Sequence, residues 1–137
     1  MKSGCQIYVK GSAEAVALYQ KAFHLVLNPE MIHMMDDGVT YIHASLMSGE
    51  NEIVAVGEDT ENWCNYETTN NKCPNMAFNV YDLGTREAVD YAYSVLSQEA
   101  RINYSPNGPS CPFWDGDGNE YWFDLVDKFG VHWGVGK

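Results

Sequence analysis

The sequence predicts an α+β fold made of two copies of one strand–helix–strand unit. Its 137 residues suit one domain, and an apolar content of 45% is enough for a hydrophobic core. Segments that alternate apolar and polar residues are mixed with two stretches that have helical periodicity. The pattern of the first half also returns in the second half, which indicates an internal repeat.

The first half begins with a strand and a helix. Residues 5–10 alternate and predict a strand. A helix is expected from Ser12, interpreted as its N-cap, to about Phe23, because Val16, Tyr19 and Phe23 form one apolar stripe. The following residues, 24–38, contain Pro29 and an Asp-Gly turn signal, so they are expected to be irregular.

Six further strands and a second helix are expected. Residues 39–48 and 52–56 alternate and are separated by Gly49-Glu50-Asn51, which is typical of a tight turn. After a polar, acidic stretch at 58–73, interpreted as a linker, the pattern resumes. The expected elements of the second half are a strand at 76–81, a helix at 85–96, a weak strand from 103 and strands at 120–126 and 131–135.

The amino-acid sequences of the two halves can be aligned with each other. The segments I7-Y8-V9 and E14-A15-V16 match F78-N79-V80 and E87-A88-V89, with two more residues between strand and helix in the second copy. Residues 52–57 match residues 131–136, which places Ala55 opposite Gly134 in the alignment. Two copies are too few for a solenoid, so a closed arrangement of two units is expected.

Composition excludes several classes of function. The net charge of −11 and the absence of a basic cluster argue against nucleic-acid partners and anionic membrane surfaces. No apolar run approaches the ~20 residues of a membrane span, and a cytoplasmic location is expected. The four cysteines form no C-x-x-C pair and are interpreted as reduced thiols.

Three segments carry a resemblance to a known superfamily. They are V9-K10-G11-S12-A13-E14-A15-V16 and the rest of the helix to Phe23, I42-H43-A44 through I53, and the D-x-F-G-x-x-W ending at 127–133. Together they resemble the PhnB-like branch of the vicinal oxygen chelate (glyoxalase/bleomycin-resistance/dioxygenase) superfamily. The resemblance implies a single domain over 1–137 with two βαβββ modules, about 5–57 and 75–135, whose cupped mixed sheet has helices on its outer face. It also implies a ligand inside the cup and a homodimer.

Strand alternation assigns residues to the two faces of this implied cup. The helix-facing set is expected to be Cys5, Ile7, Val9, Ile42, Ala44, Leu46, Met76, Phe78, Val80, Tyr121, Phe123 and Leu125. The expected ligand-binding residues are Tyr8, Tyr41, His43, Asn79 and Trp122 on the inner face, with Trp114 at the mouth. Trp133 is expected in the core.

The metal-dependent members of this superfamily place one His or Glu on each of four strands. Carried over to this sequence, these positions are Gly4, Ala55, Asn75 and Gly134. None offers an imidazole or a carboxylate, so neither a bound transition metal nor another cofactor is expected.

Several alternatives stay open from the sequence. His43 is either a ligand-binding or general-base group or a structural histidine, whereas His24 and His33 are expected at the surface and His132 in a structural role. Residues 115–120 are interpreted as a tight turn because they lack the spacing of a calcium loop.

The leading hypothesis for function is a metal-free protein that binds a small organic ligand in its cup. The alternative is a metal-dependent lyase, isomerase or dioxygenase that uses His43, Glu120 or Asp124. A third hypothesis is an interaction protein without a ligand.

Overall fold

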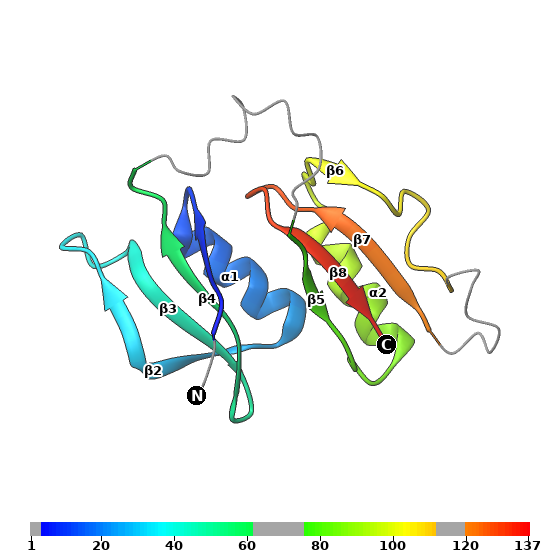
Figure 1. Ribbon diagram of the computed structural model, residues 1–137, viewed down its shortest axis with the longest axis horizontal. Helices are drawn as coiled ribbons and strands as arrows, with labels where there is room; N and C mark the ends of the chain where they lie inside the picture. Colours follow the sequence, from blue (N-terminus) through cyan, green and yellow to red (C-terminus); the bar gives the residue numbers. More distant parts are fainter. Residues whose placement is uncertain (1–3, 62–75, 112–119) are drawn as a thin grey trace. The chain divides into compact units, whose positions relative to one another are not determined.

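The computed structural model describes residues 4–61, 76–111 and 120–137. The chain divides into two compact units, Met1–Asn70 and Asn71–Lys137 (Figure 1). Each unit has the element order βαβββ and one mixed four-stranded sheet. The predicted α+β fold with two βαβββ modules is therefore confirmed. Among the described residues, no helix is long and apolar enough to cross a membrane.

Unit 1 has the sheet order β1-β4-β3-β2, in which only β1 and β4 are parallel. Its elements are β1 (Gln6–Val9), α1 (Ser12–Phe23), β2 (Val26–Met34), β3 (Tyr41–Ser48) and β4 (Asn51–Glu58). Helix α1 covers one face of this sheet, and the core between them contains buried residues of both: Val9, Ala15, Val16, Tyr19, Leu46, Val54 and Val56.

Unit 2 repeats this arrangement in the order β5-β8-β7-β6, with β5 and β8 parallel. Its elements are β5 (Phe78–Val80), α2 (Arg86–Leu96), β6 (Ile102–Asn103), β7 (Trp122–Val126) and β8 (His132–Gly136). The core beneath α2 consists of Val89, Ala92, Val95, Leu96, Phe123, Leu125, Trp133 and Val135. The predicted core position of Trp133 is confirmed.

The sheet registers correct the alignment of the two halves. Gln6 pairs with Ala55 in unit 1, and Asn79 pairs with Gly134 in unit 2, so Gln6 and not Tyr8 is the counterpart of Asn79. When Gln6 is aligned with Asn79, the first strand and the helix of unit 1 are separated from their counterparts in unit 2 by the same number of sequence positions. The second copy therefore has no extra residues between strand and helix. The backbone agrees, because Gly11 and its new counterpart Gly84 have φ angles of 84° and 83°. The sequence alignment of the first strands of the two halves was therefore wrong by two residues.

The segment predicted to be irregular contains a strand. Val26–Met34 forms β2, which pairs with β3 and has register shifts between Leu27 and Ile32 and between His33 and Met34. This strand lies at the edge of the sheet and has no fully buried residue. Without a buried face the sequence has no alternation to detect, and Pro29 is tolerated because an edge strand has unpaired N–H groups.

Helix α1 begins differently from the prediction. Its N-cap is Gly11, which makes no side-chain capping bond, whereas Ser12 lies inside the helix and its Oγ accepts from Tyr41 N. The carboxylate of Glu58, at the end of β4, accepts from Gly11 N at 3.0 Å and Ser12 N at 2.7 Å. A carboxylate at the end of β4 therefore caps the positive end of helix α1.

Asp127 explains the D-x-F-G-x-x-W ending. This fully buried carboxylate accepts from the backbone N–H of Phe129 at 2.9 Å and of Val131 at 3.0 Å. It also accepts from Trp133 Nε1 at 2.9 Å. Gly130 completes the turn with a φ of 88°, which favours glycine. The motif therefore has a structural role, since one carboxylate orders the β7–β8 corner.

Three residues predicted to face a helix are exposed instead. Ile42 is 53% exposed because the register between β2 and β3 shifts beside it, between the His33–His43 and Met34–Tyr41 pairs. Met76 and Cys5 precede the first residues of β5 and β1, outside the area that a helix covers, and both are exposed.

Candidate functional site

Each sheet has one face covered by its helix and an opposite face, here called the site face of that unit. Residues paired across strands lie on the same face. In unit 1 the pairs Gln6–Ala55 and Ser45–Ala55 place these three residues on the site face. In unit 2 the pairs Asn79–Gly134 and Asp124–Gly134 do the same. These pairings show which residues share the face opposite the helix within each unit.

His43 is held on the site face of unit 1 by Gln6. Its Nδ1 lies 2.8 Å from Gln6 Oε1, and Gln6 Nε2 donates to Ile42 O at 3.4 Å. Because the amide oxygen only accepts, His43 Nδ1 carries a proton and donates. The other ring nitrogen, Nε2, is buried and has no hydrogen-bond partner. His43 therefore has a fixed ring and an unused acceptor when neutral.

Other polar groups surround His43. Its cross-strand partner is His33, with ring centroids 6.1 Å apart. Ser45 is fully buried and its hydroxyl donates to the Glu52 carboxylate. Tyr8, which is 39% exposed, lies on the same face as Gln6 by alternation, whereas a register shift separates the His33–His43 pair from the Met34–Tyr41 pair, so Tyr41 does not share this face.

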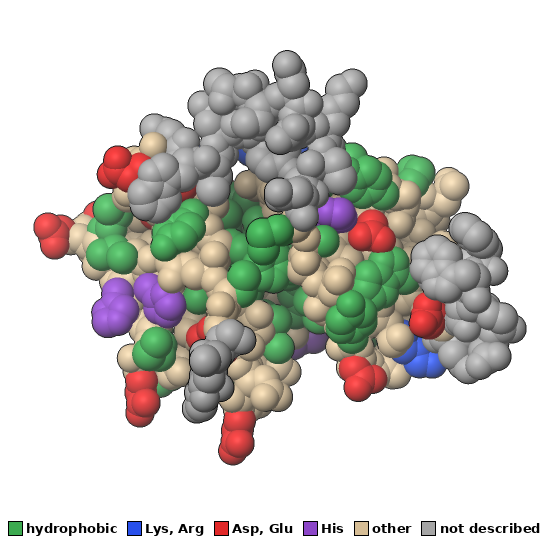
Figure 2. Space-filling model, viewed as in Figure 1, with side chains coloured by type: hydrophobic (Ala, Val, Ile, Leu, Met, Phe, Trp, Pro, Cys, Tyr) green, Lys and Arg blue, Asp and Glu red, His purple; other side chains and the backbone are tan. Residues whose placement is uncertain are grey.

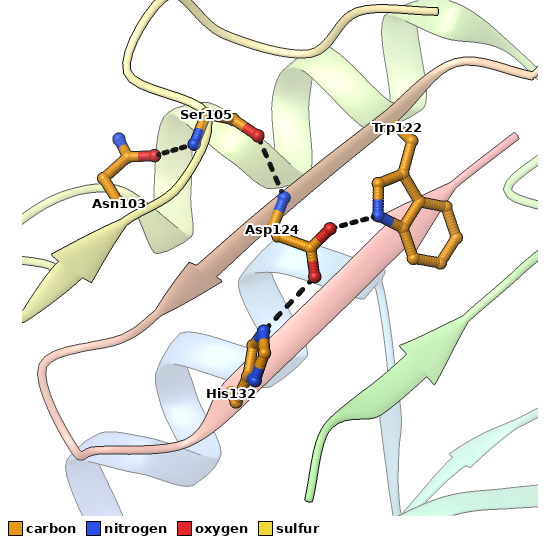
Figure 3. Close-up of polar contacts among 5 residues, drawn as sticks. All are labelled: Asn103, Ser105, Trp122, Asp124 and His132. Carbon is orange, nitrogen blue, oxygen red and sulfur yellow. Dashed lines mark hydrogen bonds and ion pairs between the residues drawn. The ribbon is translucent and has the colours of Figure 1, made fainter. Parts of the chain in front are cut away.

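Asp124 is the centre of the site face of unit 2 (Figure 3). Its Oδ2 accepts from Trp122 Nε1 at 2.6 Å, and its Oδ1 lies 3.2 Å from His132 Nε2. The backbone N–H of Asp124 donates to Ser105 Oγ at 3.0 Å, and Ser105 N donates to Asn103 Oδ1 at 2.9 Å. The carboxylate orients the indole and the imidazole together, while His132 Nδ1 is buried without a partner.

Two glycines give the Trp122 indole its position. A Cβ added to Gly134 would lie 2.5 Å from both Trp122 Cζ2 and Asn79 Oδ1, and one added to Gly136 would overlap the indole even more closely. The ring therefore lies directly over the backbone of β8, where only glycine leaves room. Tyr81 packs beside it with a centroid distance of 5.5 Å.

The structure thus groups the predicted residues by unit. Tyr8 and His43 share one site face, and Asn79 and Trp122 share the other, whereas Tyr41 lies beyond the register shift between β2 and β3 and is not grouped with His43. Trp114, like Trp63 and the turn at 115–119, lies outside the described residues. His132 was expected in a structural role, and its hydrogen bond with Asp124 places its imidazole on the site face of unit 2. Its place two residues before Gly134 was the available signal, since alternate residues of a strand share a face.

The inherited metal positions do not fit a metal. At Gly134 the space for a ligand is filled by Trp122 and Asn79, and Ala55 has no ligating atom. Asn75 lies outside the described residues, and the corrected register moves its role to Ala77, which also cannot ligate. Within residues 4–61, 76–111 and 120–137, no three His, Cys, Asp or Glu side chains are grouped to hold an ion.

Comparison with known proteins finds similarity in structure only. No protein-family model matches the chain, and no curated protein matches it. A PhnB protein from Bacillus cereus has a TM-score of 0.69 at 22% identity, with 98% of each chain covered.

Two further structures extend the similarity. A glyoxalase/bleomycin resistance protein/dioxygenase family enzyme from Burkholderia phytofirmans has a TM-score of 0.62 at 16% identity, over 98% of this chain and 95% of that one. The fosfomycin resistance protein FosX from Listeria monocytogenes, complexed with Mn(II) and sulfate, has a TM-score of 0.60 at 9% identity, over 99% and 90%. The chain therefore has the glyoxalase/bleomycin-resistance/dioxygenase fold, in a form similar to that of a PhnB protein.

Proposed function

We propose that this protein binds a small, planar, cationic organic molecule on the site face of unit 2, without a transition metal at the inherited positions. One observation carries the proposal: the Trp122 indole occupies the space over Gly134 where a metal-dependent relative would need a ligand side chain. The same indole and its neighbour Tyr81 offer aromatic surface, and aromatic rings stack favourably on planar ligands.

The negative charge of the site favours a ligand with a positive charge. Asp124 contributes a carboxylate beside Trp122, and the chain as a whole has a net charge of −11. Such a field attracts cations and repels anions, and an aromatic face adds a favourable cation–π interaction. The FosX structure contains Mn(II) and sulfate. In this protein the site contains the negative carboxylate of Asp124, which repels anions, so a phosphonate such as fosfomycin should not bind.

Thermal denaturation with a defined panel tests the proposal. Metal-free bleomycin, which carries a planar bithiazole next to a cationic tail, serves as the cationic aromatic probe and fosfomycin as the anionic one, each with and without Mn(II). Bleomycin should raise the midpoint of wild type, because a ligand that binds only the folded state stabilises it. The shift should be lost in Trp122→Leu and Asp124→Asn but kept in Tyr121→Phe, since Tyr121 directly precedes β7 and its hydroxyl bonds to Asp90 of α2. A midpoint raised by fosfomycin only with Mn(II) would contradict the proposal and favour a metal-dependent enzyme.

We also propose that the protein is a cytoplasmic homodimer. Closed twofold dimers are the commonest oligomers, and β2 presents an edge strand whose side chains include the exposed Val26 and Met31. Light scattering at micromolar concentration should give twice the mass of the chain, and a monomer would contradict the proposal.

A further inference from the structure

Building on the function proposed above, we infer that the ligand of unit 2 carries its positive charge on a quaternary ammonium group, and that Tyr104 contributes an aromatic ring to its site. Asp124 lies between aromatic side chains from both edges of the sheet, while each of its carboxylate oxygens already accepts a hydrogen bond. Figure 2 shows hydrophobic side chains gathered over β7 and β8 of unit 2, next to acidic side chains.

Two tyrosines bring their rings to this face from opposite edges of the sheet. In the strand order β5-β8-β7-β6, Tyr81 directly follows β5 and Tyr104 directly follows β6. Tyr81 packs beside Trp122, and the ring of Tyr104 packs against that of His132 with a centroid distance of 5.5 Å. The backbone N–H of Tyr104 also donates to Asp124 O at 3.1 Å, which fixes this tyrosine beside Asp124. Asp124 therefore lies within a row of rings that spans the sheet.

The rings have surface left for a ligand. Tyr81 is 65% exposed and Tyr104 is 45% exposed, and the side chain of Asp124 is 38% exposed. One face of the Trp122 indole lies against the backbone of β8, so its other face is turned away from the sheet. A cation within about 6 Å of the centre of such a ring is attracted by the negative face of the ring, and a nearby carboxylate adds to the attraction. The site thus offers aromatic faces and one negative charge.

The hydrogen bonds of Asp124 decide between types of cation. Its Oδ2 accepts from Trp122 Nε1, and because a carboxylate only accepts, His132 Nε2 carries a proton and donates to Oδ1. A guanidinium pairs best when both oxygens of one carboxylate are open to it, and here both are engaged. A primary ammonium needs acceptors to replace the water that it loses. A quaternary ammonium has no N–H group and is bound by charge and aromatic faces alone, so it fits this site.

Isothermal titration calorimetry of the full-length protein at pH 7 compares three probes that each join one positive charge to a phenyl ring. They are phenyltrimethylammonium, benzylamine and phenylguanidine, which carry a quaternary ammonium, a primary ammonium and a guanidinium. Wild type should bind phenyltrimethylammonium about tenfold more tightly than either of the others, because only the others lose hydrogen bonds to water. Equal affinity for the three probes, or tighter binding of benzylamine or phenylguanidine, would overturn the assignment to a quaternary ammonium.

Variants of Tyr104 test its part in the site. Tyr104→Leu should weaken the binding of phenyltrimethylammonium roughly threefold to fivefold, whereas Tyr104→Phe, which keeps the ring and removes only the hydroxyl, should bind like wild type. Tyr91→Leu is the matched control, because Tyr91 is an exposed tyrosine on α2, the helix that covers the other face of this sheet. Each variant should keep the circular dichroism spectrum of wild type. Unchanged binding in Tyr104→Leu, or an equal loss in Tyr104→Phe, would contradict a role for the ring.

The quaternary ammonium and the proposed function can fail separately. If bleomycin raises the thermal midpoint through Trp122 but phenyltrimethylammonium does not bind, the quaternary ammonium is overturned and the cation site remains. If neither bleomycin nor any of the three probes binds to wild type, both are overturned.

Discussion

The two units have the same topology, but their site faces differ in chemistry. The registers make Gln6 equivalent to Asn79 and Ser45 equivalent to Asp124. One step further along the strands, the position of His43 corresponds to that of Trp122. Unit 1 thus places an imidazole where unit 2 places an indole. The shared backbone fixes where a side chain projects, and the residue at that position decides what it binds.

The core shows the same contrast and gives the largest expected effect. Val54 and Trp133 are equivalent, since they pair with Leu46 and Leu125. Trp133→Val should lower the free energy of unfolding by about 4 kcal/mol, because it leaves a cavity and removes a donor from buried Asp127. Val54→Ala should cost about 2 kcal/mol. Urea denaturation measures both losses of unfolding free energy. Equal losses would contradict the expectation that the core of unit 2 depends more on Trp133 than the core of unit 1 does on Val54.

The glycines of β4 and β8 give the second test. A Cβ on Gly57 would lie 2.6 Å from the backbone oxygen of Ile42, whereas the nearest atoms to one on Gly136 belong to the Trp122 side chain. Backbone cannot yield but a half-exposed ring can, so Gly57→Ala should cost about 3 kcal/mol and Gly136→Ala about 1 kcal/mol. Gly136→Ala alone should shift the tryptophan emission. The reverse order of stabilities would show that the indole is held as rigidly as the backbone.

The helix N-termini differ in how pH affects them. Burial raises the pKa of Glu58, but the backbone N–H groups of Ser12 and Gly11 lower it further, so the pKa is below its ordinary value. Its stabilising effect is complete above the unfolded-state pKa, about 4.3, and is lost as pH falls through the lower folded-state pKa. Glu58→Gln should cost about 1 kcal/mol at pH 7 and almost nothing near pH 2.

Helix α2 supplies the matched control for that experiment. It is capped by its own Thr85, whose Oγ1 accepts from Ala88 N at 3.2 Å. Thr85→Ala should also cost about 1 kcal/mol, but equally at both pH values, since a hydroxyl does not titrate in this range. Denaturation at several pH values separates the two. A loss for Glu58→Gln that persists at the lowest pH would mean that its charge is not what caps α1.

The smallest effect is expected at Tyr121. Its hydroxyl donates to the Asp90 carboxylate at 2.8 Å, and this bond, with burial and the Asp90 charge, raises its pKa. A raised pKa makes the stabilisation complete below the unfolded-state pKa, about 10, and lost as pH rises through the folded-state value. Tyr121→Phe should cost about 0.5 kcal/mol at pH 7 and remove one tyrosine with a raised pKa from an absorbance titration. If the variant loses only a tyrosine with an ordinary pKa, the bond to Asp90 does not raise the pKa of Tyr121.

The sequence predicted which face of a strand a residue lies on better than it predicted which residue of the other half corresponds to it. The alignment of the halves was wrong by two residues, yet every predicted face within β1, β5 and β7 was retained, because side chains alternate with a period of two. A slip of one residue would have reversed them all. The helices were also predicted to within a residue, since their apolar stripes are long and regular.

What the sequence did not predict depends on contacts between distant segments. The pairing of His33 with His43 requires β2, an edge strand without a buried face. The capping of α1 by Glu58 joins residues 46 positions apart. The indole over Gly134 and Gly136 follows from the register of β7 with β8, which a repeat search does not give.

The Asp127 corner has a consequence for the order of folding. Three of its donors, Phe129 N, Val131 N and Trp133 Nε1, lie within six residues of it. Closing so short a loop has a small entropic cost, so this corner forms early in the search for the native state. The corresponding turn of unit 1, at 49–51, has no buried carboxylate at its centre. Unit 2 is therefore expected to gain protection from hydrogen exchange first, and unit 1 to follow.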